Sequence, residues 1–149
     1  MKANACKWAS FAAISVSMFT AGAQADDLLL IDLSVNNQLT ITATSGLASA
    51  NAAGSSFTGV LLAGFYNNVN ASASTLSVTG DLTAAGTTSD GSPSLFHSSG
   101  NAGLNIWSFT NNSFSFTAGQ VAFTGSATWT LSAAVYADMV GGNHSGNIY

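Results

Sequence analysis

The chain has 149 residues, and only 5% of them are charged, against about 25% in an ordinary soluble domain. Both lysines and the single cysteine lie within residues 1–25, so residues 26–149 contain no Lys, Arg, Glu or Cys. Without Lys or Arg these residues lack the cations that bind nucleic acid or clamp phosphate groups. Without Cys they exclude disulfides, zinc thiolates and thiol nucleophiles. Their charge comes from Asp26, Asp27, Asp32, Asp81, Asp90 and Asp138.

Residues 1–25 have the layout of a cleavable secretory signal. Lys2 and Lys7 form a short positive region, residues 8–20 are apolar, and Ala23-Gln24-Ala25 matches the small-x-small pattern of a cleavage site. The apolar stretch is too short to span a bilayer core of about 30 Å. We therefore expect cleavage after Ala25, a secreted or cell-surface location, and one folded domain over residues 26–149.

Apolar and polar side chains alternate over residues 29–43, which is typical of half-buried strands. The apolar positions of one face are Leu29, Ile31, Leu33, Val35, Leu39, Ile41 and Ala43. A three-residue loop at residues 36–38 pairs Val35 with Leu39 and Leu33 with Ile41. One long strand keeps the same faces, so both arrangements remain open.

The middle of the chain predicts further strands. Residues 57–66 are almost continuously apolar and suit a central strand, whereas residues 75–82 alternate. The apolar positions of the latter are Leu76, Val78, Gly80 and Leu82. Residues 89–103 are rich in Ser and Gly and contain the only proline, Pro93, so we expect a loop there.

Aromatic residues predict a meander over residues 107–123. Asn111-Asn112 suits a tight hairpin turn, because Asn tolerates the left-handed conformation. That turn pairs Phe109 with Phe114 and Trp107 with Phe116. A second turn at Ala118-Gly119 pairs Phe116 with Val121 and Phe114 with Phe123. Both registers put these side chains on one face.

The clearest alternation covers residues 121–136, where odd positions are apolar and even positions are mostly Thr, Ser or Ala. We predict one strand over this run, bent or bulged at Gly125. Helical periodicity is weak everywhere. The chain is therefore predicted to be all-β, as a single antiparallel β-sandwich of jelly-roll or immunoglobulin-like form. Since a new strand begins near Tyr149, we expect a missing C-terminal strand and an apolar edge beside residues 121–136.

Several segments resemble secreted PEP-CTERM proteins, the exosortase-sorted surface proteins of Gram-negative bacteria. They are the leader, the opening residues 27–35, the phrase over residues 39–46 and the closing Gly146-Asn147-Ile148-Tyr149. The family's C-terminal Val-Pro-Glu-Pro motif, apolar helix and basic tail are absent from residues 1–149, so we expect truncation or release. The resemblance implies an extracellular-matrix or biofilm setting beside exopolysaccharide, and it implies no catalytic residues.

Few residues suggest site chemistry. His97 and His144 lie in polar loops without a Gly-x-Ser-x-Gly elbow, so we predict no catalytic residue, cofactor or metal ligand. Asp81 and Asp90 flank a polar loop whose oxygens suit Ca²⁺. Lone aspartates in turns are usually backbone caps, however, and calcium binding is left open.

Tyr66 and Tyr136 are the candidates for an exposed platform that stacks on sugar rings, whereas Trp107 and Trp129 have the parity of core residues. The leading hypothesis is a non-enzymatic secreted surface or matrix protein that self-associates, because few charges protect its strand edges. The alternative is a carbohydrate-binding module acting on exopolysaccharide. Neither hypothesis involves nucleic acid, and contact with a membrane would require a sorting tail.

Overall fold

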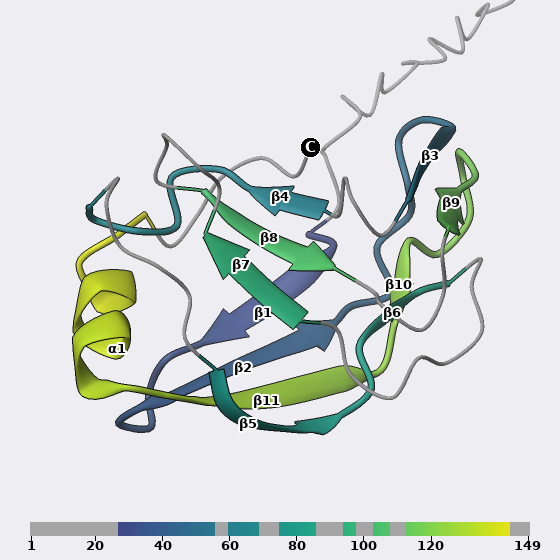
Figure 1. Cartoon of the computed structure of the whole chain (residues 1–149). Coiled ribbons are helices and arrows are strands. Elements are labelled where there is room, and N and C mark those ends of the chain that lie inside the picture. Colours follow the sequence, from purple (N-terminus) through teal and green to yellow (C-terminus); the bar gives the residue numbers. More distant parts are fainter. Residues whose placement is uncertain are drawn as a thin grey trace, which may run out of the picture.

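The largest sheet of the protein is antiparallel and has four strands (Figure 1). In spatial order these are β1 (Leu29–Asp32), β2 (Gln38–Ala43), β11 (Ser126–Leu131) and β5 (Thr75–Gly80). The structure is a computed structural model and describes residues 27–55, 60–68, 75–85, 94–97, 103–107 and 113–143. The predicted leader and the expected C-terminal strand lie outside these ranges.

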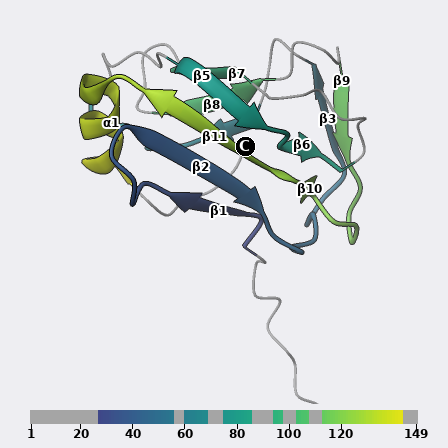
Figure 2. The same cartoon turned by 90° about the horizontal axis from the view of Figure 1, so that it is seen from below.

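A second, three-stranded antiparallel sheet lies across the core from the first (Figures 1 and 2). Its order is β4 (Val60–Leu62), β8 (Leu104–Trp107) and β7 (Ser94–His97). Two shorter pairs join β3 (Ala52–Ser55) to β9 (Ser113–Phe116), and β6 (Thr83–Ala84) to β10 (Phe123–Thr124). The all-β prediction is confirmed, whereas the single antiparallel β-sandwich, of jelly-roll or immunoglobulin-like form, stays a prediction.

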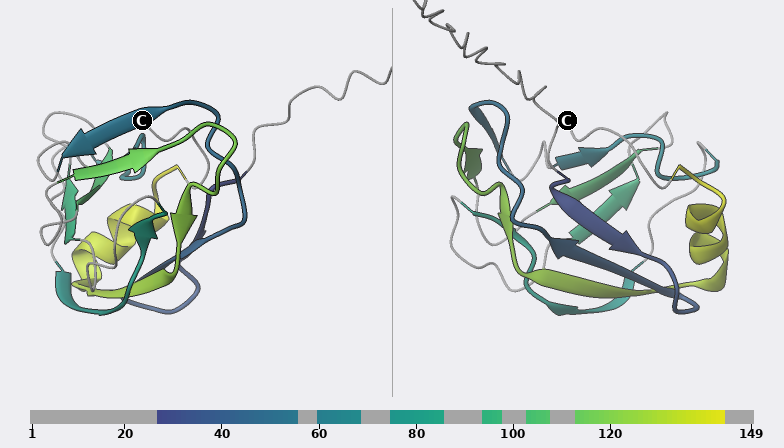
Figure 3. Two further views of the ribbon diagram at one scale, coloured as in Figure 1. Left: turned by 90° about the vertical axis from the view of Figure 1, so that its right-hand side faces the viewer. Right: turned by 180° about the vertical axis from the view of Figure 1, so that it is seen from behind.

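One helix, α1 (Ala133–Val140), follows β11 directly. It lies beyond one end of the four-stranded sheet, and β3 and β9 lie beyond the other end (Figure 3). The Ser132 side chain accepts a hydrogen bond from the Val135 N–H, which caps the first turn of the helix.

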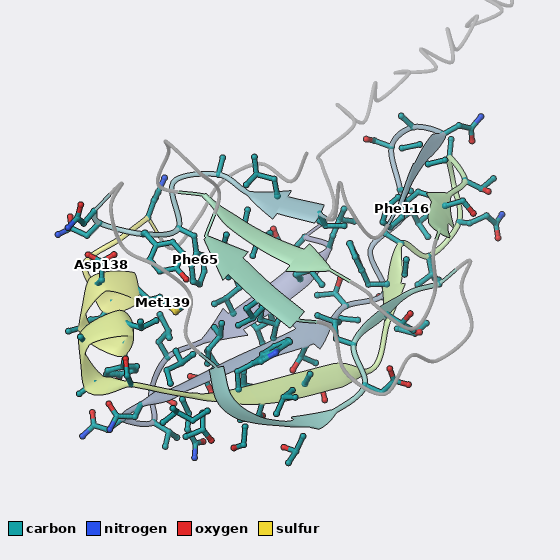
Figure 4. The ribbon with its side chains drawn as sticks, viewed as in Figure 1. Phe65, Phe116, Asp138 and Met139 are labelled. Carbon is teal, nitrogen blue, oxygen red and sulfur yellow. The ribbon has the colours of Figure 1, made fainter. Side chains whose placement is uncertain are left out.

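The core lies between the two sheets and extends to α1. Leu39, Ile41 and Trp129 of the four-stranded sheet have no exposed surface. Leu104 faces them from the three-stranded sheet, and it is equally buried. Phe65 and Met139 close the core on the inner side of α1 (Figure 4). Burial of such side chains contributes about 1.5–3 kcal/mol each, so the contacts between layers are the main source of stability.

The prediction of one strand over residues 121–136 is wrong in its extent, because the structure has two shorter strands and a helix there. The strand is interrupted at Gly125, where the predicted bend is confirmed by a φ of +80°. It also ends at Leu131, because Ser132 caps α1 and the helix buries Val135 and Met139. Residues four apart share a helix face as well as a strand parity, so Val135 fits the odd, apolar positions in either structure.

The first predicted aromatic hairpin is also wrong. Trp107 lies opposite Ser94 in the three-stranded sheet, while Phe116 lies opposite Ala52 in the β3–β9 pair. Phe109 and the Asn111-Asn112 turn fall outside the described residues. β9 therefore finds its partner far away in the sequence, and no local turn signal specifies such a partner.

The second predicted turn is confirmed in place but not in register. Gly119 has a φ of +75° in the turn after β9, and the Gln120 N–H donates to the Thr117 carbonyl. The rings of Phe116 and Phe123 are in contact, with centroids 5.1 Å apart. Val121, however, bridges to Leu47, so the strand after the turn does not pair with β9 as predicted.

Of the two arrangements left open for residues 29–43, the structure has the hairpin, with a different register. Ile31 lies opposite Ile41, so the pairing is shifted by two positions from the predicted Leu33–Ile41 pair. The turn is tight because Asn37 adopts a φ of +60° and the Gln38 N–H donates to the Val35 carbonyl. A shift of two positions keeps every side chain on its predicted face.

Three further expectations are corrected. β4 is an edge strand of its sheet rather than a central strand, because β8 occupies the middle. Leu76, assigned to the buried face of residues 75–82, is 67% exposed. No free edge lies beside β11, since β2 and β5 pair with its two sides.

Substitution of Gly125 tests how strongly the fold depends on the bend at this residue. A Cβ atom at Gly125 would lie 1.9 Å from the Asp81 carbonyl oxygen, whereas a Cβ at Gly119, with a similar φ, has nothing within 4 Å. We expect Gly125→Ala to lower the free energy of unfolding by about 3 kcal/mol or more, through backbone strain and the clash. Gly119→Ala should cost about 1 kcal/mol, for the left-handed conformation alone. Urea denaturation measures both values, and equal losses would contradict the clash.

Candidate functional site: outer face and edges of the four-stranded sheet

The face of the four-stranded sheet that points away from the core carries short hydroxyl side chains. Ala127, Trp129 and Leu131 of β11 are buried, so the alternate residues Thr128 and Thr130 point outward. The same alternation in β2 buries Leu39 and Ile41 and turns the intervening threonines outward. The outer face is therefore polar but almost uncharged.

The register aligns these side chains in rows across the sheet. The central row is Asp32, Thr40, Thr128 and Thr79, one residue from each strand. The Oγ1 atoms of Thr40 and Thr128 are 2.8 Å apart and share a hydrogen bond. The flanking rows are Leu30, Thr42, Ser126 on one side and Gln38, Thr130, Ser77 on the other.

Asp32 is the charged residue of these rows. Its carboxylate accepts a hydrogen bond of 2.7 Å from the Ser34 N–H. Hydrogen bonds from Ser34 lower the pKa of Asp32 below its ordinary value, so the group carries a negative charge at neutral pH. One edge of the outer face thus bears a carboxylate, and the opposite edge bears hydroxyl groups.

β1 and β5 are the outermost strands of this sheet, and they lie on opposite sides of it (Figure 2). Among the residues that the structure describes, no strand pairs with the outer side of either one. Each edge also carries an exposed leucine: Leu30 is 64% exposed and Leu76 is 67% exposed. Both edges combine available backbone groups with apolar surface.

Neither edge strand contains Lys or Pro, which usually protect strand edges, and no strand in the described part of the chain pairs with either edge. β1 is short and holds one carboxylate, that of Asp32. β5 contains a bulge, because Leu76 is the extra residue between the Thr75–Leu131 and Ser77–Thr130 pairs. From Ser77 to Gly80 its pairing is regular, and no side chain there is charged.

The two tyrosines predicted to contact carbohydrate do not form an exposed platform. Tyr66 is 2% exposed, so the prediction that its ring faces solvent is wrong. Tyr136 is half-buried on α1, and its hydroxyl donates a 2.6 Å hydrogen bond to the Leu33 carbonyl. Trp129 is fully buried, as predicted, while the side chain of Trp107 lies outside the described residues.

Tyr66 instead belongs to a buried junction between the segment after β4 and α1. The Asp138 carbonyl accepts from the Asn67 N–H, and the Asp138 carboxylate accepts from the Asn68 N–H. Burial raises the pKa of Tyr66, and the negative charge of Asp138 raises it further. Figure 4 shows Asp138 on α1 near Phe65. These contacts fix the end of the helix, which is a structural role.

In the described part of the chain, no group of three His, Cys, Asp or Glu residues lies close enough together to hold a metal ion. Asp90, His144 and the side chain of His97 lie outside that part. The outer rows, and the identity of the two edge strands, were not predicted from the sequence. The repeated Thr-x-Thr of β2 and β11 was a usable signal, but the register that aligns these residues depends on distant strands.

Comparisons with known proteins do not assign the chain to a family. No family model matches the chain, and no curated protein or solved structure is significantly similar to it. Within the ranges that the structure describes, no helix is long and apolar enough to cross a membrane. The function is therefore inferred from geometry and sequence.

The buried position of Tyr66 predicts an alkaline loss of stability. Because its pKa is raised in the folded state, the protein is fully stabilised below the ordinary tyrosine pKa of about 10, and the stability falls as the pH rises above it. We expect a slope of up to about 1.4 kcal/mol per pH unit above pH 10 in the free energy of unfolding. Urea denaturation of the Tyr66→Phe variant should lack this slope, and Tyr136→Phe should retain it.

Proposed function

We propose that the chain is a non-enzymatic structural protein of the cell surface or extracellular matrix, which self-associates through the edges of its four-stranded sheet. The observation that carries the proposal is the pair of edge strands, β1 and β5, whose outer sides are unpaired among the described residues. An extracellular setting is supported by the leader-like residues 1–25 and by the resemblance to PEP-CTERM surface proteins.

Physical chemistry links such edges to assembly. An unpaired edge presents a row of backbone N–H and C=O groups, which are a template for another strand. Exposed Leu30 and Leu76 add apolar surface at the same edges, and burial of that surface favours association by about 25 cal/mol per Å². Assembly is also the route by which a domain without disulfides gains stability, since each copy protects its neighbour from unfolding.

Carbohydrate binding is the alternative function, and the described residues offer it less support. Stacking on a sugar needs an exposed ring. The aromatic side chains that the structure describes are all buried or half-buried: Phe65, Tyr66, Phe116, Phe123, Trp129 and Tyr136. A pull-down of the exported protein with exopolysaccharide tests this alternative directly, and specific retention would favour it.

Self-association predicts a mass that depends on concentration and salt. The chain is expressed with its own leader, and the exported form is studied by analytical ultracentrifugation. We expect the weight-average mass to rise with protein concentration. It should rise further with NaCl, because the aspartates of residues 26–149 make the copies repel one another and salt screens that repulsion. A strict monomer at every concentration and salt level would contradict the proposed function.

A further inference from the structure

We propose that copies of this chain join head to tail, with β5 of one copy pairing antiparallel with β1 of the next, so that the four-stranded sheet continues into an open filament. The inference rests on the proposed self-association and specifies its partner, direction and register. It assigns the two edges, Leu29–Asp32 and Ser77–Gly80, as the two halves of one interface.

The direction follows from the strand order. Each neighbouring pair in the order β1, β2, β11, β5 is antiparallel, so β1 and β5 run in opposite directions. A second copy placed beside the first in the same orientation therefore sets its β1 antiparallel to β5. The core side of the sheet remains the core side, and no strand has to reverse. An interface between two different edges does not close, so it generates a filament.

The backbone groups of the two edges match. The Thr44 N–H donates to the Leu28 carbonyl, so residues 28, 30 and 32 bond to β2, and the N–H and C=O of Leu29 and Ile31 point outward. The Asp81 N–H donates to the Ser126 carbonyl, so the same reasoning turns the groups of Val78 and Gly80 outward. Ile31 opposite Val78, and Leu29 opposite Gly80, are then hydrogen-bonded pairs.

Side chains fit this register as well as the backbone. Ile31 and Val78 are both partly buried against the core of their own copies, so their pairing continues the inner, apolar face. Outside, Asp32 lies opposite Ser77 and Leu30 lies opposite Thr79. A shift by one position would set outer residues opposite inner ones. The inner, apolar side chains would then no longer continue the buried face, so this register is disfavoured.

Repulsion between aspartates favours this register over the one in which Asp32 lies opposite Thr79. With Ile31 opposite Val78, Asp81 lies four positions along the strand from the incoming Asp32, or about 13 Å, which exceeds the screening length of about 8 Å at physiological salt. Sliding the strands so that Asp32 meets Thr79 would halve that separation. The remaining approach of like charges is between Asp81 and Asp27, both outside the paired stretch, since β5 ends at Gly80 and β1 begins at Leu29.

Pairing of like edges is less favourable. Two antiparallel β1 strands place Asp32 within two positions of Asp27 or Asp32 of the other copy in each register that overlaps the strand, and like charges on adjacent strands are destabilising. Two β5 strands are uncharged, but a register that sets inner residues against inner ones overlaps at most three residues of Ser77–Gly80, and a longer pairing reaches the bulge at Leu76 or Asp81. β5 with β1 avoids both costs, because Ser77–Gly80 is regular and overlaps all of β1.

Figure 2 shows that the ends of the molecule do not obstruct this contact. α1 lies beyond one end of the strands and β3 and β9 lie beyond the other, so neither covers the side of β1 or of β5. Because each strand in a sheet is rotated by about 20–25° from its neighbour, successive copies would wind about the filament axis.

Cysteine cross-linking tests the interface. The chain's one cysteine, Cys6, lies in the predicted leader, so the exported form offers a cysteine-free background. Leu30 and Thr79 face outward and exposed, and in the proposed register they form a non-hydrogen-bonded pair, whose Cα atoms approach to about 4.5 Å. That spacing suits a disulfide. Both substitutions leave the core untouched.

A mixture of the exported Leu30→Cys and Thr79→Cys proteins should shift from monomer to covalent dimer under mild oxidation on a non-reducing gel. Each variant alone should stay monomeric on that gel, and the double variant should give a ladder. Leu30→Cys mixed with Thr130→Cys is the matched control, because Thr130 points outward from a central strand. Urea denaturation of the reduced proteins checks that each variant folds.

The outcomes separate the inference from the proposed function. Homodimers of a single variant equal in yield to the mixture would overturn head-to-tail pairing in favour of like edges. Absence of cross-linking, with wild-type protein that still self-associates, would overturn this interface and leave the proposed function standing. Wild-type protein that remains monomeric would overturn both.

Discussion

Trp129 occupies the centre of β11, with Leu39 of β2 on one side and Val78 of β5 on the other, and none of its side chain is exposed. Residues 26–149 have no cysteine to form a disulfide and no Lys or Arg to form an ion pair with their aspartates. The fold therefore depends on burial of this indole and on the backbone ladders beside it. Those ladders join segments far apart in the sequence, so we expect the sheet to form slowly, after long loops have closed.

Local patterns predicted local structure well. Alternation identified β1, β2, β5 and β11, and the parity of Trp129 correctly assigned it to the core. Ala118-Gly119 marked a real turn, because Gly119 tolerates a positive φ. Asn37, in the loop that the sequence left open at residues 36–38, also has a positive φ. The helix escaped notice because Val135 keeps strand parity, and the bulge escaped because nothing local distinguishes Leu76 from Val78.

Local patterns did not predict which segments pair with one another in the fold. Phe116 has a suitable turn on its C-terminal side, yet its strand pairs with β3, because pairing depends on which hydrophobic faces must meet in the core. The burial of Tyr66 has the same origin: Asn67 and Asn68, which follow it, bond to Asp138 of α1, about seventy residues away. Of the candidate site, low charge predicted exposed edges in general, but only the register shows that β1 and β5 are those edges and that the threonines align between them.

The position of Met139 has a chemical consequence. It is the only sulfur-containing residue of residues 26–149. Its side chain lies on the buried side of α1 and has no exposed surface. Oxidants therefore meet no exposed thioether on the folded part of the chain that the structure describes, and Met139 is oxidised only when the helix lifts from the core. A sulfoxide would then be too polar to return to its apolar site. Burial thus protects the Met139 thioether from oxidation, and each copy with an oxidised Met139 is one in which the helix has opened.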